Sequence, residues 1–196
     1  MKTNRLILFV SFLLITGMVF GQSTVWKFDK AHTKLQFVAT HMKISEVTGQ
    51  FKQYTGKIVF DKKDFTDADI RVTIPVNSID TDNEKRDKHL MSEDFFNADQ
   101  YSEIRFESES LNKDSENHYK LRGKLTIKDV TRTVTFDVKY MGTVEAMGAT
   151  RAGFKLSTTI DRFDYNIDWD KSFGQGLIVG REVKIVADVE LIKEGT

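Results

Sequence analysis

The sequence predicts an all-β protein, an eight-stranded antiparallel barrel with a short helical segment. Apolar and polar residues alternate along about eight segments, which is typical of strands with one buried and one solvated face. Short polar turns separate these segments, as in an antiparallel barrel or sandwich. One stretch, residues 81–108, replaces the alternation with helix signals. The strands are long and closure removes exposed edges, so the pattern favours the barrel over the sandwich.

The first 21 residues are typical of an export signal, and we expect them to be cleaved. Lys2 and Arg5 precede an apolar run over residues 6–20, and Val19-Phe20-Gly21 resembles a cleavage site. An uncleaved anchor is the alternative, but the run is shorter than the ~20 residues of a spanning helix. Residues 22–196 are then predicted to form one periplasmic or secreted domain, which contains no Cys and is stabilised by its core alone.

The charge of the chain argues against nucleic-acid binding. Lys and Arg number 29, as do Asp and Glu, so removal of Lys2 and Arg5 leaves a net charge near −2. A nucleic-acid-binding domain would carry a clear basic excess.

The first half of the mature chain predicts three long strand regions. Their apolar alternates are, in the first region, Trp26 and Phe28 followed by Leu35, Phe37 and Ala39, in the second, Val47, Gly49, Phe51, Tyr54, Gly56, Ile58 and Phe60, and in the third, Ile70, Val72, Ile74 and Val76. The alternation changes parity between Phe51 and Tyr54, which predicts a bulge or bend. Residues 61–67 are predicted to be a charged turn. Pro75 cannot donate to a ladder and is expected at an edge or bulge.

Residues 81–108 are predicted to contain a short helix, a second helical turn and a return to strand at Ser102. Thr81 and Glu84 have the spacing of a capping box. Ser92 offers a second cap before Phe95 and Phe96. A barrel would use such a segment as a cover over one end.

The second half predicts five further strands. Their apolar alternates are Ile104 and Phe106, then Tyr119, Leu121, Gly123, Leu125 and Ile127, then Val134, Phe136, Val138 and Tyr140, then Ala152, Phe154, Leu156 and Ile160, and finally Val179 to Leu191. Turns are predicted at residues 112–117 and 128–131, and loops at residues 141–150 and 161–176.

An eight-stranded barrel has room for packed side chains or for one small ligand. The residues predicted to form its apolar interior are Leu35, Phe37, Phe51, Ile58, Phe60, Val72, Ile74, Leu90, Met91, Phe95, Phe96, Phe106, Leu121, Leu125, Phe136, Val138, Phe154, Leu156, Val183 and Ile185. For each Phe, core packing and ligand contact both remain open. Gly49, Gly56 and Gly123 either leave volume in the wall or permit bends.

Several short motifs, in order along the chain, are similar to those of one family. They are Trp26-Lys27-Phe28-Asp29 with His32-Thr33-Lys34-Leu35-Gln36-Phe37, His41 with Val47-Thr48-Gly49-Gln50-Phe51, Ser78-Ile79-Asp80-Thr81 with Arg86-Asp87-Lys88-His89-Leu90, Asp94-Phe95-Phe96, Ile104-Arg105-Phe106-Glu107-Ser108, Gly123-Lys124-Leu125-Thr126-Ile127, and Val179-Gly180 with Val183. Through these motifs the chain resembles the YceI family of exported bacterial proteins.

The resemblance implies a lipocalin-like barrel that binds a long apolar lipid in its interior. The implied ligands are polyisoprenoids, quinone-like molecules and fatty amides, and the implied assembly is a homodimer. We therefore expect a lipid carrier with only transient membrane contact. No cofactor is expected other than a bound lipid as ligand.

Arg86, Asp87 and His89 form the most reactive-looking cluster, since a His beside a carboxylate can serve acid–base catalysis. On a helix Arg86 and His89 share a face and Asp87 points elsewhere, which favours a polar network that fixes the helix to the barrel. His41, Arg86 and His89 are candidate contacts for a lipid head group. The alternatives to a carrier are a lipid-modifying enzyme that uses this cluster and a structural module with a filled interior. We expect that the protein is not an enzyme.

The sequence predicts no metal site. The four histidines, His32, His41, His89 and His118, have no metal-binding spacing. Asp164, Asn166 and Asp168 mimic the start of a calcium loop, but Trp169 stands where glycine is needed and Gln175 where glutamate is needed.

Overall fold

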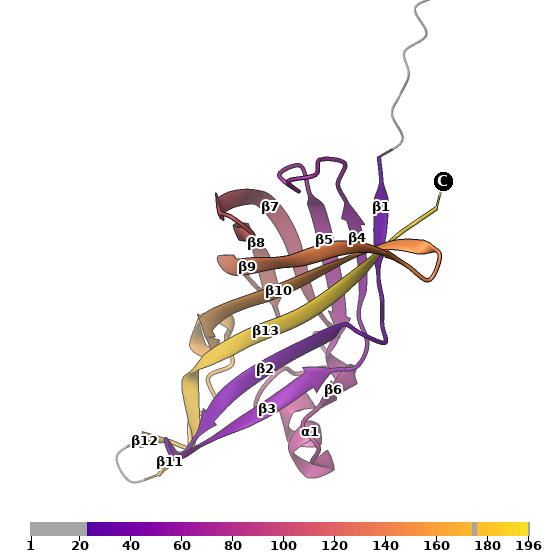
Figure 1. Ribbon diagram of the computed structural model, residues 1–196. Coiled ribbons are helices and arrows are strands. Elements are labelled where there is room, and N and C mark those ends of the chain that lie inside the picture. The colour runs from indigo at the N-terminus through magenta and orange to yellow at the C-terminus, as the bar shows by residue number, and fades with distance from the viewer. Residues whose placement is uncertain (1–22, 174–175, 196) are drawn as a thin grey trace, which may run out of the picture.

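The computed structural model describes residues 23–173 and 176–195, and these form the predicted closed, eight-stranded antiparallel barrel (Figure 1). The ring consists of β1 (Val25–Phe28), β4 (Thr55–Val59), β5 (Asp69–Pro75), β7 (Glu103–Ser115), β8 (His118–Ile127), β9 (Val130–Ala146), β10 (Ala149–Asp161) and β13 (Val179–Lys193). Strand β1 pairs with both β4 and β13, and this closes the ring. The expected export segment lies outside the described residues.

Two adjacent strands of the barrel wall are each divided by a break. In the first, β1 is followed by β2 (Lys34–His41), and in the second, β3 (Ser45–Phe51) is followed by β4. Strand β13 pairs with β1 near its C-terminal end and with β2 over the rest of its length. Strand β2 pairs with β3, which continues into β4. The short β6 (Ile79–Asp80) extends the sheet beyond β3, and β11 (Ser172–Phe173) pairs with β12 (Gly176–Leu177) in a separate hairpin.

The change of parity between Phe51 and Tyr54 is confirmed as the break between β3 and β4. Tyr54 is buried in this break and its hydroxyl donates to the main-chain oxygen of Thr33, 3.0 Å away, in the break between β1 and β2. Thr33 in turn exchanges hydrogen bonds with the main chain of Glu190 on β13. These bonds hold the two interruptions together where the ladder is missing.

Helix α1 (Glu84–Met91) lies within the predicted helical segment, but the predicted capping box is wrong and the helix begins two residues later than that box implies. The N-cap is Asn83, whose side chain accepts from the main-chain nitrogen of Arg86 at 2.9 Å. Asp82 has a left-handed φ of 57°, so the chain turns there and leaves Asn83 at the cap. Ser92 is the C-cap of α1, and turns replace the second helical turn before β7 begins at Glu103.

Two predicted loops are largely strand. Strands β9 and β10 continue through residues 141–150 and leave a two-residue turn, Met147-Gly148, with φ of 52° and 74°. Positive φ at both central residues matches the twist of the flanking strands, so this turn makes a tight hairpin. Strand β7 likewise reaches Ser115 and replaces most of the turn predicted at residues 112–117.

Different segments cover the two ends of the barrel (Figure 1). The helical segment with α1 lies at one end. The β4–β5 loop lies at the other, and it carries Phe65 into the barrel, where its ring contacts Phe60, Tyr119, Tyr140 and Phe154 at centroid distances from 4.9 to 5.9 Å. The predicted charged turn at residues 61–67 therefore contains a core residue. Two 3-10 turns complete the fold, η1 (Val76–Ser78) and η2 (Arg162–Tyr165).

Among the described residues, no helix is both long enough and apolar enough to span a bilayer.

Candidate functional site

The barrel encloses an apolar cavity of about 260 Å³. Side chains from all eight ring strands line it, together with residues of β2, β3, α1 and η2. The volume is close to the lower end of the ~300–1,000 Å³ range of ligand pockets. The lining is apolar throughout, because Gln36, Arg162 and Tyr165 contribute mainly their apolar atoms to it. Such a cavity suits a molecule that is mostly hydrocarbon.

The structure brings together around this cavity every residue predicted for the apolar interior except Met91. Leu90 and Met91 are neighbours on α1, where successive side chains diverge by about 100°. Only Leu90 faces the cavity, and Met91 packs against the edge of the core. That these residues contact a ligand remains a prediction.

Some further lining residues were missed because their segments lack alternation. Phe65 comes from the charged β4–β5 loop, and Arg162, Tyr165 and Ile167 come from the loop after β10. A Phe within a charged turn was the one available signal for the first. For the residues of the loop after β10, the only signal in the sequence was the high content of aromatic residues in that loop.

The three glycines in the wall do not enlarge the cavity, because aromatic rings occupy the space beside them. A Cβ on Gly49 would lie 2.2 Å from the Phe37 ring, and one on Gly123 would lie 2.5 Å from the Phe106 ring. A Cβ on Gly56 would likewise lie 2.7 Å from the ring of Phe28. The glycines permit these large rings to lie flat on the wall.

The segment that begins with α1 covers the cavity with three apolar side chains, Leu90, Phe95 and Phe96. Phe96 packs edge-on against Phe51 with centroids 6.4 Å apart. Phe95 packs against Trp169 with centroids 5.2 Å apart. The cover therefore contacts both β3 and the loop after η2.

A polar network fixes the start of α1 to the chain that leaves β6. The Arg86 guanidinium donates to the hydroxyl and main-chain oxygens of Thr81 at 2.7 and 2.6 Å. The Asp87 carboxylate accepts from the nitrogen and hydroxyl of Thr81 at 3.0 and 2.5 Å. Thr81 is buried, so each of its polar groups is satisfied by the helix. This geometry matches the interpretation of the charged run as a structural connection.

His41, Arg86 and His89, the candidate head-group contacts, do not line the cavity. Arg86 is engaged by Thr81. His89 Nε2 lies 2.7 Å from Asp94 Oδ2, with side chains 43% and 55% exposed. The carboxylate beside His89 is thus Asp94 rather than Asp87, and the pair faces solvent.

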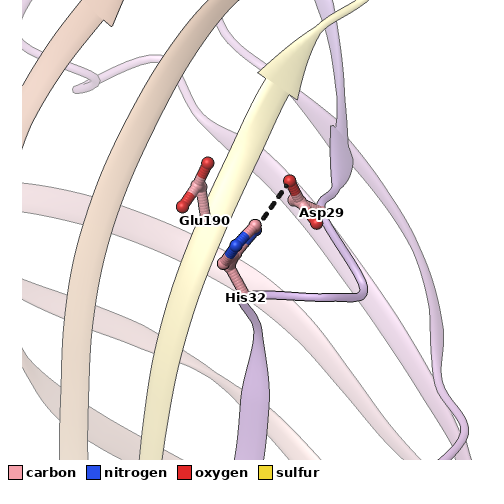
Figure 2. A group of neighbouring side chains, drawn as sticks. All are labelled: Asp29, His32 and Glu190. Carbon is pink, nitrogen blue, oxygen red and sulfur yellow. Dashed lines mark ion pairs between the residues drawn. The ribbon is translucent and has the colours of Figure 1, made fainter.

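A second polar cluster lies where β1 and β2 meet β13 (Figure 2). Asp29, His32 and Glu190 offer ligand atoms that all lie within 4.8 Å of one another, a grouping that histidine spacing alone did not predict. The Arg151 guanidinium, however, donates to Asp29 Oδ2 at 2.5 Å and to Glu190 Oε1 at 2.7 Å. Hydrogen bonds from His32 and from Arg151 lower the pKa of Asp29 to about 2. Arg151 therefore already supplies the cation that these carboxylates need.

Fold and cavity together define a class of protein, a small closed antiparallel barrel with an apolar interior. Within this class the chain belongs to the YceI family, because the family model described as YceI-like domain matches residues 26–191.

Curated relatives and solved structures agree with this assignment. The UPF0312 protein SA2479 of Staphylococcus aureus is 37% identical over 170 residues, which cover 85% of this chain and 96% of the relative. The crystal structure of BcnA from Burkholderia cenocepacia has a TM-score of 0.70 at 26% identity and covers 83% of this chain and 98% of its own. A polyisoprenoid binding domain from Saccharophagus degradans shares the fold, with a TM-score of 0.64 at 12% identity over 87% of this chain and 99% of its own.

Proposed function

We propose that this protein is an exported carrier that holds one long-chain apolar lipid inside its barrel. The observation that carries the proposal is the apolar cavity of about 260 Å³, closed at one end by Phe65 and covered at the other by Leu90, Phe95 and Phe96. A lipid chain placed there gains roughly 0.8 kcal/mol for each CH₂ group removed from water. The polyisoprenoid binding named for the structural neighbour supports the same class of ligand.

The ligand enters, in this proposal, past the helical segment. This cover rests on aromatic contacts and on the Thr81 network rather than on strand pairing with the barrel, whereas β4 and β5 directly flank the opposite loop. Contact with a membrane would then be transient, during loading and release. Polyisoprenoids, quinone-like molecules and fatty amides are the candidate ligands.

A binding role fits the site better than catalysis does. Among the residues that the structure describes, the histidine–carboxylate pair near the cover is the exposed His89–Asp94 pair, and neither residue lines the cavity. The His89 ring packs edge-on against Phe95 and Trp169 with centroids 5.0 and 5.3 Å apart, so any effect of His89→Ala on lipid binding is expected to come from the cover rather than from lost catalysis. The homodimer implied by the family remains a prediction, which light scattering on the purified protein tests.

The proposal is tested by native mass spectrometry and organic extraction of gently purified protein. The expected result is an added mass that matches one long-chain lipid per barrel, recovered in the extract. Protein that is empty and that also fails to take up added polyprenyl or quinone lipids would refute the carrier function.

A further inference from the structure

The β4–β5 loop holds one aromatic ring within a charged turn. The Asp67 carboxylate accepts hydrogen bonds from the main-chain nitrogens of Asp61 and Lys62 at 3.0 and 3.1 Å, which ties the two ends of the turn together. The main-chain nitrogen of Phe65 donates to the oxygen of Lys62, and that of Ala68 donates to the oxygen of Phe65, both at 3.0 Å. The position of Phe65 is therefore fixed by hydrogen bonds within the loop itself.

Phe65 has a left-handed φ of 59°, which is uncommon for a bulky residue because its Cβ crowds the backbone. Such a conformation costs free energy and persists only where the surrounding structure enforces it. Here it directs the ring into the end of the barrel, where Phe65 is 5% exposed and lines the cavity. The ring packs edge-on against Phe60 and Phe154 at centroid distances of 5.1 and 5.2 Å. Phe65 thus forms the end wall of the cavity, at the end of the barrel opposite to α1 (Figure 1).

Among the described residues, the aromatic rings that pack around Phe65 bring no polar group into the cavity. Those that carry a hydroxyl are Tyr119 and Tyr140, with ring centroids 5.9 and 4.9 Å from that of Phe65, and neither residue lines the cavity. The Tyr140 hydroxyl donates to the Thr143 hydroxyl at 2.6 Å. A lipid that enters past the segment of α1 would therefore place its hydrocarbon tail against Phe65 and leave its head near the cover.

We propose that Phe65 sets the maximum length of the hydrocarbon chain that the barrel holds. This inference rests on the proposed carrier function and adds to it the selection of ligands by chain length. Each methylene group that enters the cavity tightens binding about fourfold, because it is removed from water. Once the tail meets the Phe65 ring, further methylene groups stay outside the cavity and add no affinity.

The alternative is that Phe65 only packs the end of the barrel. A residue with that role alone would, when shortened, change the affinity for all chains by one common factor and leave the limiting length where it was. The two roles are separated by the chain length at which the affinity stops rising.

The test is displacement of a fluorescent apolar probe from the full chain by saturated straight-chain fatty acids, from octanoic to octadecanoic acid. For the wild type we expect the affinity to rise about fourfold with each added methylene group and then to stop rising within this series. Phe65→Leu has a smaller apolar side chain, and the limit should move to chains longer by about two carbon atoms or more, because the space of the ring becomes available. Phe163→Leu is the matched control, because Phe163 lies outside the cavity lining and its replacement should leave the limit unchanged.

Phe65→Ala should move the limit further than Phe65→Leu does. Thermal melts report whether these variants fold, and the wild-type series tests the proposal if they do not. An affinity that keeps rising up to octadecanoic acid in the wild type, or an unchanged limit in folded Phe65→Leu, would overturn the proposal for Phe65. Failure of every fatty acid in the series to bind would instead refute the carrier function on which it rests.

Discussion

Replacing Ala39 with tryptophan should block the cavity without unfolding the barrel. Ala39 lines the cavity from β2, opposite Val183 on β13. The cavity of about 260 Å³ gives the indole space to enter. If the ring displaces about three methylene groups of a lipid chain, the loss at ~0.8 kcal/mol each is about 2.4 kcal/mol. This corresponds to a roughly 60-fold weaker Kd.

The assay is probe displacement by hexadecanoic acid and by a polyprenyl lipid, with a thermal melt of each variant. Val38→Trp is the matched control, because successive strand side chains point to opposite faces and Val38 lies outside the cavity lining. We expect the control to bind as the wild type does. Equal binding by Ala39→Trp and the wild type, with both folded, would refute the assignment of the cavity as the binding site.

Three further predictions concern stability. Phe65→Ala removes the ring that packs between Phe60 and Tyr140, and should lower the free energy of unfolding by about 3–5 kcal/mol in urea titrations. Gly123→Ala places a Cβ 2.5 Å from both the Glu107 oxygen and the Phe106 ring, and should cost about 1–3 kcal/mol. Asp29 has a pKa lowered from 3.8 to about 2, so its stabilisation of roughly 2 kcal/mol is fully present above pH ~4 and is lost as the pH falls toward 2. Asp29→Asn should therefore be less stable at pH 7, with a flatter pH dependence between pH 4 and 2.

Two of these predictions have a control variant, and the third has an outcome that would contradict it. Gly153→Ala meets only the Met141 Cβ at 3.3 Å and should cost less than Gly123→Ala. Phe163→Ala removes a ring that lies outside the cavity lining, and should cost less than Phe65→Ala. If Asp29→Asn kept the acid-dependent stability of the wild type, that dependence would not come from the Asp29 carboxyl, which would contradict its lowered pKa.

The inward face of the barrel could be predicted from the sequence because successive side chains of a strand point to opposite faces of the sheet. Phe136 and Val138 illustrate this, since their spacing of two placed both on the cavity wall. The cover was predicted for the same reason, as a segment in which the alternation stops and new apolar residues appear.

The remaining features depend on tertiary contacts that no local pattern specifies. Phe65 lies in a charged turn with a left-handed φ of 59°, and its burial becomes evident only when the barrel end forms around it. The helix cap was misassigned because Thr81 and Asn83 are both good cap residues, and the left-handed turn at Asp82 selects Asn83. Arg162 was missed because its partners, Gly180 and Val179, are brought to it by the closing strand.

The central claim is that a lipid chain occupies the barrel, and photo-crosslinking tests it most directly. A hexadecanoic acid with a diazirine near its tail end is incubated with the protein, irradiated, and located by peptide mass spectrometry. Labels on cavity residues such as Leu125, Phe136 and Leu156, lost in Ala39→Trp, are the predicted result. Labels confined to outward-facing residues, or unaffected by that substitution, would contradict the account.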